Sequence, residues 1–295
     1  MTDRILIVDG MALLFRGYFA SAYGGYIRRT SDGTPTNAVY GFTRYLLDAI
    51  RRFKPSHVVC CWDTSGKTFR SDRYEAYKGN RPEAPDDLIP QFGLVRNVTD
   101  GLGIPNIELR GYEADDCIGT LAKRFAAEDK HVFVVSGDGD LLQLVADRIH
   151  VVLMKKGFSQ YAVYDPAALL EERQLRPEQI IDLKGLTGDT SDNYPGVKGI
   201  GEKTAVKLLQ EHGSIDGILS NLELLTASVR KKIEQDLDML HLCRDLATIR
   251  CDVPIECDVE ACRWRPDEEL VRSKFMELEF ESLMKEANSL LAKIG

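Results

Sequence analysis

Three short, continuous apolar segments constrain the fold of this 295-residue chain more than any other feature. They are ILIV at residues 5–8, HVVCCW at 57–62 and HVFVV at 131–135, and RIHVVLM at 148–154 is a fourth candidate. Strands that are buried on both faces have this uninterrupted apolar character, whereas half-exposed strands alternate between apolar and polar residues. The pattern predicts an α/β fold: a central, largely parallel sheet with helices on both faces.

Helical periodicity fills the sequence between these segments. Apolar side chains recur at helical spacing in residues 36–53 and 112–127. After about residue 185 the strand signals fade, and the remainder is predicted to be helical, with an extended interruption at CDVPIECDV. We expect an α/β domain over residues 1–185 and a helical region over residues 186–295. The hydrophobic content of 44% is sufficient for a core in each.

Composition excludes several classes of protein. No apolar run approaches the roughly 20 residues of a membrane span, and Asp9 interrupts the first apolar segment, so we expect no membrane association and a cytoplasmic location. The seven cysteines are an odd number without C-x-x-C pairs, which favours reduced, buried thiols over disulfides or structural zinc. The net charge of −8 argues against a protein that coats DNA through a uniformly basic surface.

Acidic residues follow the first three predicted strands, at the edge where an open parallel sheet binds its ligands. Asp9 follows the first strand and Asp63 the second, and the segment SGDGD after the third contains Asp138 and Asp140. Further acids are expected in the first turn of the helix that begins at GYEADD and in the segment GDTSDN: Glu113, Asp115, Asp116, Asp189 and Asp192.

Each acid alone has an ordinary explanation as a turn residue, a helix cap or a partner of the helix dipole. Together, nine carboxylates at one edge would repel one another strongly unless cations neutralise them or most bind protons. Oxygen ligands without histidine or thiolate suit Mg²⁺ or Mn²⁺, and two such ions are a known arrangement for phosphodiester hydrolysis. His57 and His131 precede their strands, so a histidine general base is not expected. Without the nine acids the net charge becomes slightly positive, which is compatible with a polyanionic partner.

The segment PGVKGIGEKTA combines a glycine-rich turn with lysines, just before a predicted helix at residues 202–210. Backbone N–H groups at a helix N-terminus bind phosphate, and Lys198, Lys203 and Lys207 add positive charge. The pattern is similar to a helix-hairpin-helix, which binds the backbone of duplex DNA without reading its sequence. An ordinary glycine-rich corner between two helices is the alternative.

A second basic segment, GKTFRSDRYEAYKGNRPEAP, contains two prolines at its end. On a helix, Arg70, Tyr74, Lys78 and Arg81 lie on one face, which suits a nucleic-acid strand held by phosphate contacts and stacking. The alternative is a solvated helical face.

The order of these motifs along the chain resembles the 5′-3′ exonuclease (flap endonuclease) family, in particular the N-terminal nuclease of bacterial DNA polymerase I. The motifs are Asp9, Asp63, YKGNRP, YEADD, SGDGD and GDTSDN with GVKGIGEKTA, and the resemblance extends to LATIRCDVPIE and FMELEFESLMK near the end. It implies a helical arch around residues 67–95 over an active site, a helix-hairpin-helix that holds duplex DNA, and a monomeric protein.

The resemblance also implies roles for individual residues. One metal is expected among Asp9, Asp63, Glu113, Asp115 and Asp116, and a second among Asp138, Asp140, Asp189 and Asp192. Lys78 and Arg81 match positions that act on the scissile phosphate, Lys184 matches a further active-site lysine, and Tyr77 matches a position that stacks on a displaced base. The expected DNA contacts are Arg70, Tyr74, Tyr77, Gly196, Lys198, Gly199, Gly201, Lys203 and Thr204, with a potassium ion at the hairpin. Tyr194 and Lys198 depart from the aliphatic residue and the proline that are usual in the family, so we expect hairpin packing and DNA affinity to differ.

The expected function is that of a Mg²⁺-dependent 5′-3′ exonuclease and 5′-flap endonuclease. Its substrates would be branched or 5′-ended duplex DNA and RNA primers on DNA, processed at the nucleoid alongside a DNA polymerase and a ligase. The rival hypothesis is a non-catalytic DNA-binding protein that recognises branches, but such a protein has no reason to retain acids that repel phosphate. A phosphatase on a similar sheet would require Asp-x-Asp after the first strand, where Met11 occupies the second position.

Overall fold

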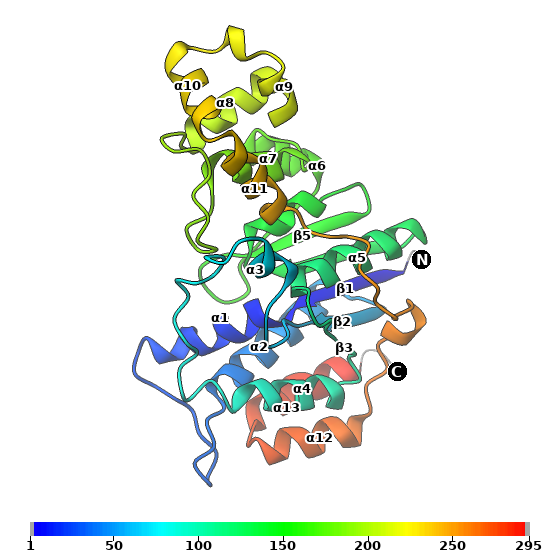
Figure 1. The fold of residues 1–295 in the computed structure, drawn as a ribbon. Helices are drawn as coiled ribbons and strands as arrows, with labels where there is room; N and C mark the ends of the chain where they lie inside the picture. Colours follow the sequence, from blue (N-terminus) through cyan, green and yellow to red (C-terminus); the bar gives the residue numbers. More distant parts are fainter. Residues whose placement is uncertain (1–2, 293–295) are drawn as a thin grey trace.

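A six-stranded sheet forms the centre of the protein, whose computed structural model describes residues 3–292 (Figure 1). The strand order is β3-β2-β1-β4-β5-β6. Strands β1 to β5 are parallel, and β6 pairs with β5 in the antiparallel direction. The strands are β1 Arg4–Asp9, β2 His57–Cys61, β3 Asn106–Ile107, β4 His131–Ser136, β5 Ile149–Met154 and β6 Tyr161–Tyr164. The four predicted strands and the predicted fold class are confirmed. The two edge strands were not predicted, because β3 has only two residues and β6 is mostly half-exposed.

Two apolar cores lie on opposite faces of the sheet, as the alternation of β1 requires. Ile5 and Ile7 point into one core, and Leu6 and Val8 point into the other. The Leu6 face is covered by α1 Gly10–Ala22, α2 Asn37–Phe53, α4 Gln91–Gly101, α12 Glu268–Glu277 and α13 Glu281–Leu291. The Ile5 face is covered by α5 Ala114–Ala127, and the helices that follow β6 extend the same apolar core away from the sheet: α6 Pro166–Arg173, α7 Gln179–Thr187, α8 Glu202–His212, α9 Ile215–Leu219, α10 Ala227–Gln235 and α11 Leu237–Ala247. The helices predicted at residues 36–53 and 112–127 are therefore confirmed as α2 and α5.

The strand order changes direction between β1 and β4. The chain builds β1, β2 and β3 toward one edge, then crosses back and places β4 on the other side of β1. In an open α/β sheet this point leaves a crevice beyond the carboxyl ends of the two strands. Asp9 ends β1, and Asp138 lies two residues beyond the end of β4, so both lie at this crevice. His57 and His131 begin their strands, and so lie at the opposite edge, as predicted.

The helices after residue 186 do not form one separate layer. In Figure 1, α8, α9 and α10 lie at the top of the view, whereas α12 and α13 lie at the bottom, where α12 contacts α4 and α13 contacts α2. An extended segment, residues 248–259, connects the two groups and runs along α5, where Arg124 donates hydrogen bonds to the carbonyls of Ile255 and Cys257 (3.0 and 2.9 Å). This segment matches the extended interruption predicted at CDVPIECDV. The last two helices thus complete the core of the α/β part.

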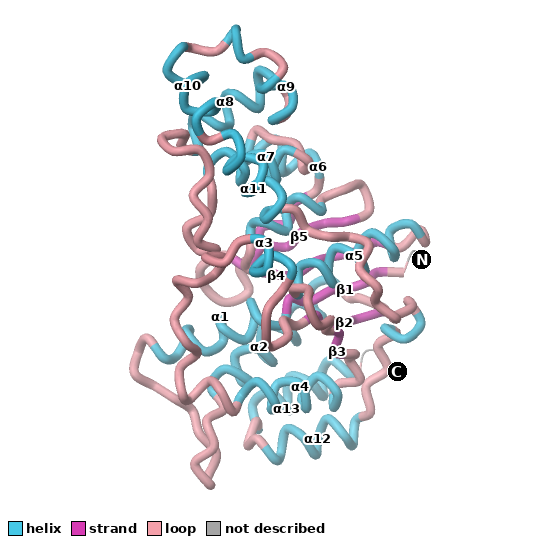
Figure 2. Tube along the Cα trace, in the orientation of Figure 1, coloured by secondary structure: helices cyan, strands magenta, loops and turns pink. Residues whose placement is uncertain are grey.

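The predicted helical arch is only partly helical. The structure has one short helix, α3 Phe69–Arg73, followed by turns and extended chain up to α4, seen as loop in Figure 2. Lys78 has a left-handed backbone (φ 55°), which cannot occur inside an α-helix. The prediction that Arg70, Tyr74, Lys78 and Arg81 share one helical face is therefore wrong.

All seven cysteines are free, and six of them are buried, as the odd count predicted. None of the helices between residues 3 and 292 combines the length and the apolar character needed to cross a lipid bilayer.

Candidate active site

The carboxylates at the strand ends are held by neutral hydrogen-bond donors. Asp9 is the N-cap of α1: one oxygen accepts from the Ala12 N–H (2.9 Å) and the other from the Ser136 hydroxyl (2.6 Å). Asp63, two residues beyond β2, accepts from the N–H of Ala114 at the start of α5 (2.7 Å). These bonds fix the carboxylates in place without neutralising them, because the donors carry no net charge.

A cavity of about 580 Å³ opens beyond these strand ends. Five of the predicted carboxylates line it: Asp9, Asp63, Glu113, Asp115 and Asp138. Lys78 and Arg81 also line it, as does Ser191. We call this space the acidic cavity.

The sequence analysis missed three residues of α1 that line the acidic cavity: Met11, Phe15 and Arg16. The signal was available, because Phe15 and Arg16 lie one helical turn beyond Met11 and Ala12, at the i+4 spacing that places side chains on one face. Arg16 donates hydrogen bonds to backbone carbonyls, including that of Gly157 (3.3 Å), and among the described residues it has no carboxylate partner.

A second cavity of about 450 Å³ adjoins the first, since Asp138 lines both. It contains Asp140, Asp189 and Lys184 and extends to Glu202 at the start of α8. The two predicted groups of acids therefore meet in one continuous region, with Asp138 between them.

Four carboxylates of this region, which we call the open carboxylates, form no ion pair with any described residue: Asp9, Asp63, Asp115 and Asp138. Burial, with the nearby charges of Asp63 and Asp138, raises the pKa of Asp9 to about 6. Burial, followed by the charges of Asp138 and Asp9, raises the pKa of Asp115 well above its ordinary value. The direction of both shifts shows that the ionised cluster is electrostatically costly on its own.

The other five acids, which we call the paired carboxylates, each contact a cationic side chain: Glu113, Asp116, Asp140, Asp189 and Asp192. Lys78 pairs with Glu113 at 2.9 Å, and Lys184 bridges Asp140 (2.5 Å) and Asp189. Burial pushes the pKa of Asp189 upward, but the hydrogen bonds from Lys184 and Ser191, together with the Lys184 charge, outweigh it and the pKa falls to about 2. Burial and the neighbouring Asp138 charge instead raise the pKa of Asp140 to about 7.

Asp116 does not line either cavity, which corrects its predicted place among the metal ligands. The side chain is fully buried and accepts two bonds from Arg70 (2.8 and 2.9 Å) and one each from the N–H groups of Glu113 (3.0 Å) and Arg250 (2.9 Å). Its oxygens are therefore saturated beneath the cavity.

Arg70 is correspondingly unavailable to DNA in this conformation, contrary to the predicted contact. It is 2% exposed and also donates to the carbonyls of Leu246 and Thr248 (both 2.8 Å). Burial opposes its charge, but the hydrogen bonds and charge of Asp116 raise the pKa of Arg70. Sequence reasoning missed this role because Arg70 and Asp116 are 46 residues apart.

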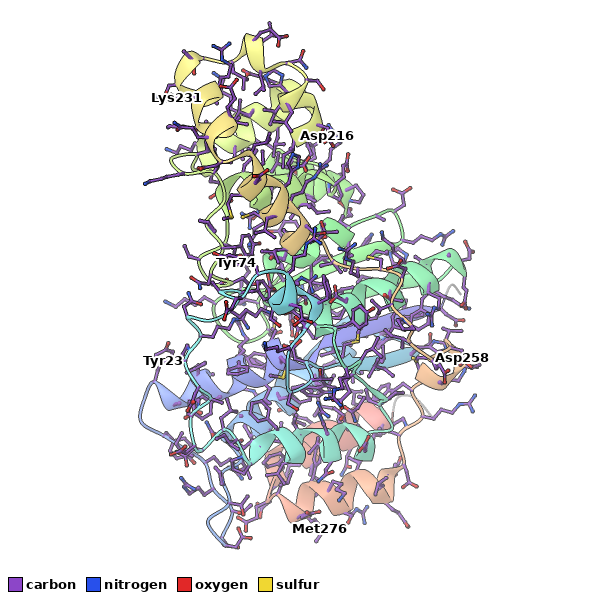
Figure 3. All side chains as sticks on the ribbon, in the orientation of Figure 1. Tyr23, Tyr74, Asp216, Lys231, Asp258 and Met276 are labelled. Carbon is purple, nitrogen blue, oxygen red and sulfur yellow. The ribbon has the colours of Figure 1, made fainter. Side chains whose placement is uncertain are left out.

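Tyr77 is also buried, at 7% exposure, and does not present its ring to solvent. Its hydroxyl donates to Asp192 (2.9 Å) and lies 3.1 Å from Glu113, while its ring stacks on Tyr194. Asp192 accepts from Arg81 as well (2.6 Å) and lines neither cavity. Tyr74, which is labelled in Figure 3, is half-buried and packs against the apolar cluster that contains Tyr77 and Tyr194.

The glycine-rich turn leads into α8, which begins at Glu202 as predicted. Gly201 is the N-cap and supplies no side chain, so the first N–H groups of the helix have no side-chain cap. The exposed residues here are Lys198, Gly199, Gly201, Lys203 and Thr204. Each of these predicted DNA contacts is thus accessible.

Gly196 differs from the exposed residues of the glycine-rich turn in its environment. It is buried, with a left-handed backbone (φ 65°), and a Cβ atom there would lie 2.2 Å from the Gly188 nitrogen. Its N–H donates to the Cys243 sulfur (3.3 Å). The predicted DNA contact of Gly196 is therefore corrected: this glycine allows two backbone segments to pack closely.

A basic group on α10 was not singled out from the sequence. Arg230, Lys231 and Lys232 follow one another there, and Lys232 donates to the carbonyl of Gly199 (2.9 Å). Figure 3 shows Lys231 at the same end of the molecule as α8. Only the fold reveals this group as part of the surface around the turn, because 33 residues separate Lys232 from Gly199.

The donor set fits hard divalent cations. The acidic and hydroxyl side chains that line the two cavities offer oxygen ligands, which Mg²⁺ and Mn²⁺ prefer. Within residues 3–292, no three acidic, histidine or cysteine side chains lie close enough together to hold a metal ion in this conformation. The open carboxylates line a shared space instead, which suits ions that keep several water ligands.

A parallel sheet with an acidic cavity at its switch point, next to an exposed glycine-lysine turn, is typical of a hydrolase that cleaves nucleic-acid phosphodiesters. The chain belongs to the 5′-3′ exonuclease family, because residues 4–174 match the model of the 5′-3′ exonuclease N-terminal resolvase-like domain and residues 175–269 match that of the 5′-3′ exonuclease C-terminal SAM fold.

Curated relatives support this assignment. The chain is 50% identical over 258 residues to a 5′-3′ exonuclease of Bacillus subtilis, covering 88% of this chain and 87% of that protein. It is 40% identical to the DNA polymerase I of Bacillus caldotenax and 43% identical to that of Thermus aquaticus, but it spans only 33% of the length of each. The resemblance to the N-terminal nuclease of DNA polymerase I is thereby confirmed.

Solved structures share the fold. A bacteriophage T5 5′-exonuclease with bound zinc superposes with a TM-score of 0.68 at 22% identity, over 93% of this chain and 98% of that one. The catalytic core of Rad2 in complex with DNA gives a TM-score of 0.62 at 18% identity, over 100% and 93% of the two chains.

Proposed function

We propose that this protein is a Mg²⁺-dependent, structure-specific nuclease that cleaves 5′ flaps and trims 5′ ends of DNA, and of RNA primers on DNA. The observation that supports this most directly is the acidic cavity, where five carboxylates converge and four of the region's acids have no cationic partner. A cluster of this kind is costly for folding, so a cation-dependent task accounts for its presence.

Two or more divalent ions are proposed for the cavities, with Mn²⁺ as a substitute for Mg²⁺. Asp9, Asp63, Asp115 and Asp138 would hold one, with Glu113 released from Lys78. Asp138, Asp140 and Asp189 would hold another, and Asp192 would join them only if its contacts with Tyr77 and Arg81 were given up. When bound, such ions activate water for attack and stabilise the leaving oxygen.

Lys78 and Arg81 are proposed to act on the scissile phosphate, since both line the acidic cavity. The Lys78 side chain is 24% exposed and pairs with Glu113 in the lining of the cavity, where it would attract a phosphate and stabilise charge that develops during cleavage. Lys184 neutralises Asp140 and Asp189 and would position them. Cleavage would leave a 3′-hydroxyl and a 5′-phosphate.

The glycine-rich turn is proposed to hold duplex DNA through its backbone phosphates, with K⁺ between the turn and the DNA. The exposed lysines Lys198 and Lys203, the uncapped start of α8 and the basic group on α10 lie around this turn. These contacts would carry no sequence information, which agrees with an enzyme that recognises the shape of its substrate.

The cellular context is also a proposal. The DNA polymerase I relatives suggest that the protein acts on replication and repair intermediates together with a polymerase and a ligase, as a monomer in the cytoplasm near the nucleoid. We further propose that residues 1–185 supply the chemistry and residues 186–295 most of the duplex grip.

The test is the cleavage of a 5′-labelled flap duplex and of the matching blunt duplex, with Mg²⁺ and with EDTA, with product lengths mapped. Metal-dependent cuts at the branch are the expected result. Tight binding without cuts in either Mg²⁺ or Mn²⁺ would instead establish the non-catalytic branch-recognising protein.

A further inference from the structure

The loop that leads into the glycine-rich turn is hydrogen-bonded to the segment that carries Lys78 and Arg81. We call residues 76–81 the cationic segment and residues 190–193 the docking loop. The Lys78 N–H donates to the Asp192 carbonyl (2.9 Å), and the Asn80 amide donates to the Thr190 carbonyl (2.9 Å). The first bond joins two backbone groups and the second comes from the Asn80 side chain, so neither depends on a charged side chain.

Asn193, in the docking loop, adds a further hydrogen bond to the cationic segment. Its side-chain amide donates to the carbonyl of Ala76 at 2.6 Å. Asn193 has a left-handed backbone (φ 61°), a conformation that asparagine tolerates better than most residues. Lys78, two residues after Ala76, is left-handed as well (φ 55°). A conformation that is unfavourable for lysine persists only where surrounding contacts hold it, and the Asn193 amide is one of these contacts.

We propose that Asn193 is a positioning residue that holds the cationic segment in register over the acidic cavity, so that Lys78 reaches the scissile phosphate. The inference rests on the proposed function, because it assigns to Asn193 a role in the same cleavage reaction. Asn193 lines neither cavity, so its effect would pass through Lys78.

The docking loop also connects this contact to the glycine-rich turn. The loop is continuous with Gly196, which packs against Gly188, and its base is closed by the mutual hydrogen bonds of Asp189 and Tyr194 (2.8 and 3.0 Å). A duplex held at residues 198–204 would therefore fix the docking loop and, through Asn193, the segment that carries Lys78. The enzyme would have its phosphate-binding lysine in place when duplex is bound.

The first experiment measures this contact without relying on catalysis. Amide hydrogen exchange is compared between the wild type and Asn193→Gly, which removes the side-chain amide, adds no charge and tolerates the left-handed backbone. We expect exchange of residues 76–81 to accelerate at least about fivefold, because the opening free energy of a segment falls when a contact that holds it is lost.

A matched control is available in Asn221→Gly. The Asn221 amide also donates to a backbone carbonyl, that of Gly217 (2.8 Å), but on the far side of the helical region. This variant should leave exchange of residues 76–81 unchanged. Equal exchange in Asn193→Gly and the wild type would overturn the proposal.

The second experiment measures cleavage of a flap duplex at saturating Mg²⁺. Asn193→Gly should lower kcat by about tenfold and leave KM within about twofold, because a misplaced Lys78 affects the reacting phosphate more than the duplex grip. In a Lys78→Ala background the same change should have less than about a twofold effect. A loss of equal size in both backgrounds would show that Asn193 does not act through Lys78 and would overturn the role proposed here. If the wild type does not cleave at all, the proposed function fails and with it the catalytic role of Asn193, while the exchange result still decides whether Asn193 holds the segment.

Discussion

The open carboxylates and the paired carboxylates lie next to each other, yet their surroundings differ in kind. Asp9 and Asp63 accept hydrogen bonds only from neutral groups, and burial raises the pKa of Asp9 to about 6. Asp189, a short distance away, contacts Lys184, and its pKa falls to about 2. The open group stores electrostatic repulsion that only an external cation or a proton relieves, whereas the paired group, apart from Asp140, is neutralised by cationic side chains of the protein.

This difference follows from where the two groups originate. The open carboxylates stand at the ends of β1 and β2, after β4 and in the first turn of α5, where the sheet fixes the backbone. Three of the paired acids, Asp140, Asp189 and Asp192, lie instead on short helical or loop segments, within reach of Lys184 and Arg81. Rigid elements thus hold the groups that repel one another, and rigid placement of a cation site is what fast chemistry requires.

The largest expected effect separates the two groups by activity. Asp9→Asn should lower flap cleavage by at least about 10³-fold, because the amide oxygen can still accept from Ala12 and the amide nitrogen can donate to the Ser136 hydroxyl, but the charge that binds the cation is lost. Asp192→Asn should cost no more than about tenfold, since Asp192 lines neither cavity. Single-turnover rates at saturating Mg²⁺ measure both. If Asp192→Asn is as damaging as Asp9→Asn, the distinction between open and paired carboxylates has no meaning for catalysis.

A second prediction compares two ion pairs at different depths. Arg70→Met should destabilise the protein by about 3–5 kcal/mol, because it leaves the fully buried Asp116 charge without its partner. Arg81→Met should cost less than about 1 kcal/mol, since the Arg81 side chain is 49% exposed. Urea unfolding of both variants in EDTA gives the two values. Similar losses would mean that burial does not govern these pairs.

A third prediction concerns the exchange of a protein cation for a metal ion. Lys184→Met should lower stability by about 2 kcal/mol in EDTA, because Asp140 and Asp189 then repel each other at a partly exposed site. Saturating Mg²⁺ should recover most of this loss, since an ion that binds only the folded state supplies the missing charge. Lys207→Met is the control, because Lys207 pairs with Glu211 on an exposed face of α8. A deficit that persists unchanged in Mg²⁺ would show that no ion binds near Lys184.

The sequence was sufficient to predict the sheet and the acids at its edge, because both depend on local patterns. Buried strands are short apolar runs, and the residue after a parallel strand lies at a known edge. The pairing of Arg70 with Asp116 was not predictable in this way, because the two residues are 46 positions apart. From local pattern alone, neither differs from the exposed charged residues around it.

The predicted arch shows that tertiary contacts can also override a local pattern. Steps of three and four residues from Arg70 to Arg81 are compatible with a helix, but the hydrogen bonds to residues 190–193 and the left-handed Lys78 override this local preference. Likewise, Gly196 belongs to a motif that binds phosphate, yet the approach of Gly188 buries it. Tertiary contacts decided which members of each motif face the substrate.

The last prediction is a pH dependence of the metal-free protein, whose sign follows from which carboxyl pKa values are raised and which are lowered. The raised pKa values of Asp9 (about 6) and Asp140 (about 7) mean that the folded state holds protons that the unfolded chain, with carboxyl pKa values near 4, has already released. Their contribution is therefore fully present below about pH 4 and is lost as pH rises through 6 to 7. The lowered pKa of Asp189 acts in the other direction, but its contribution is already complete above about pH 4 and stays constant from there.

Stability in EDTA should consequently fall by roughly a few kcal/mol between pH 5 and pH 8, measured by urea unfolding. Asp9→Asn removes one of the groups whose pKa is raised, so its decline should be smaller and its stability at pH 8 should exceed that of the wild type. The variant would thus be more stable and inactive, which is the relation expected where a functional site retains repelling charges. Saturating Mg²⁺ should reverse the slope for the wild type, because the ion binds the ionised carboxylates and competes with protons. A wild-type stability that rises with pH in EDTA would mean that Asp9 and Asp140 do not retain protons in the folded state, and that the open carboxylates are not a charged cluster awaiting a cation.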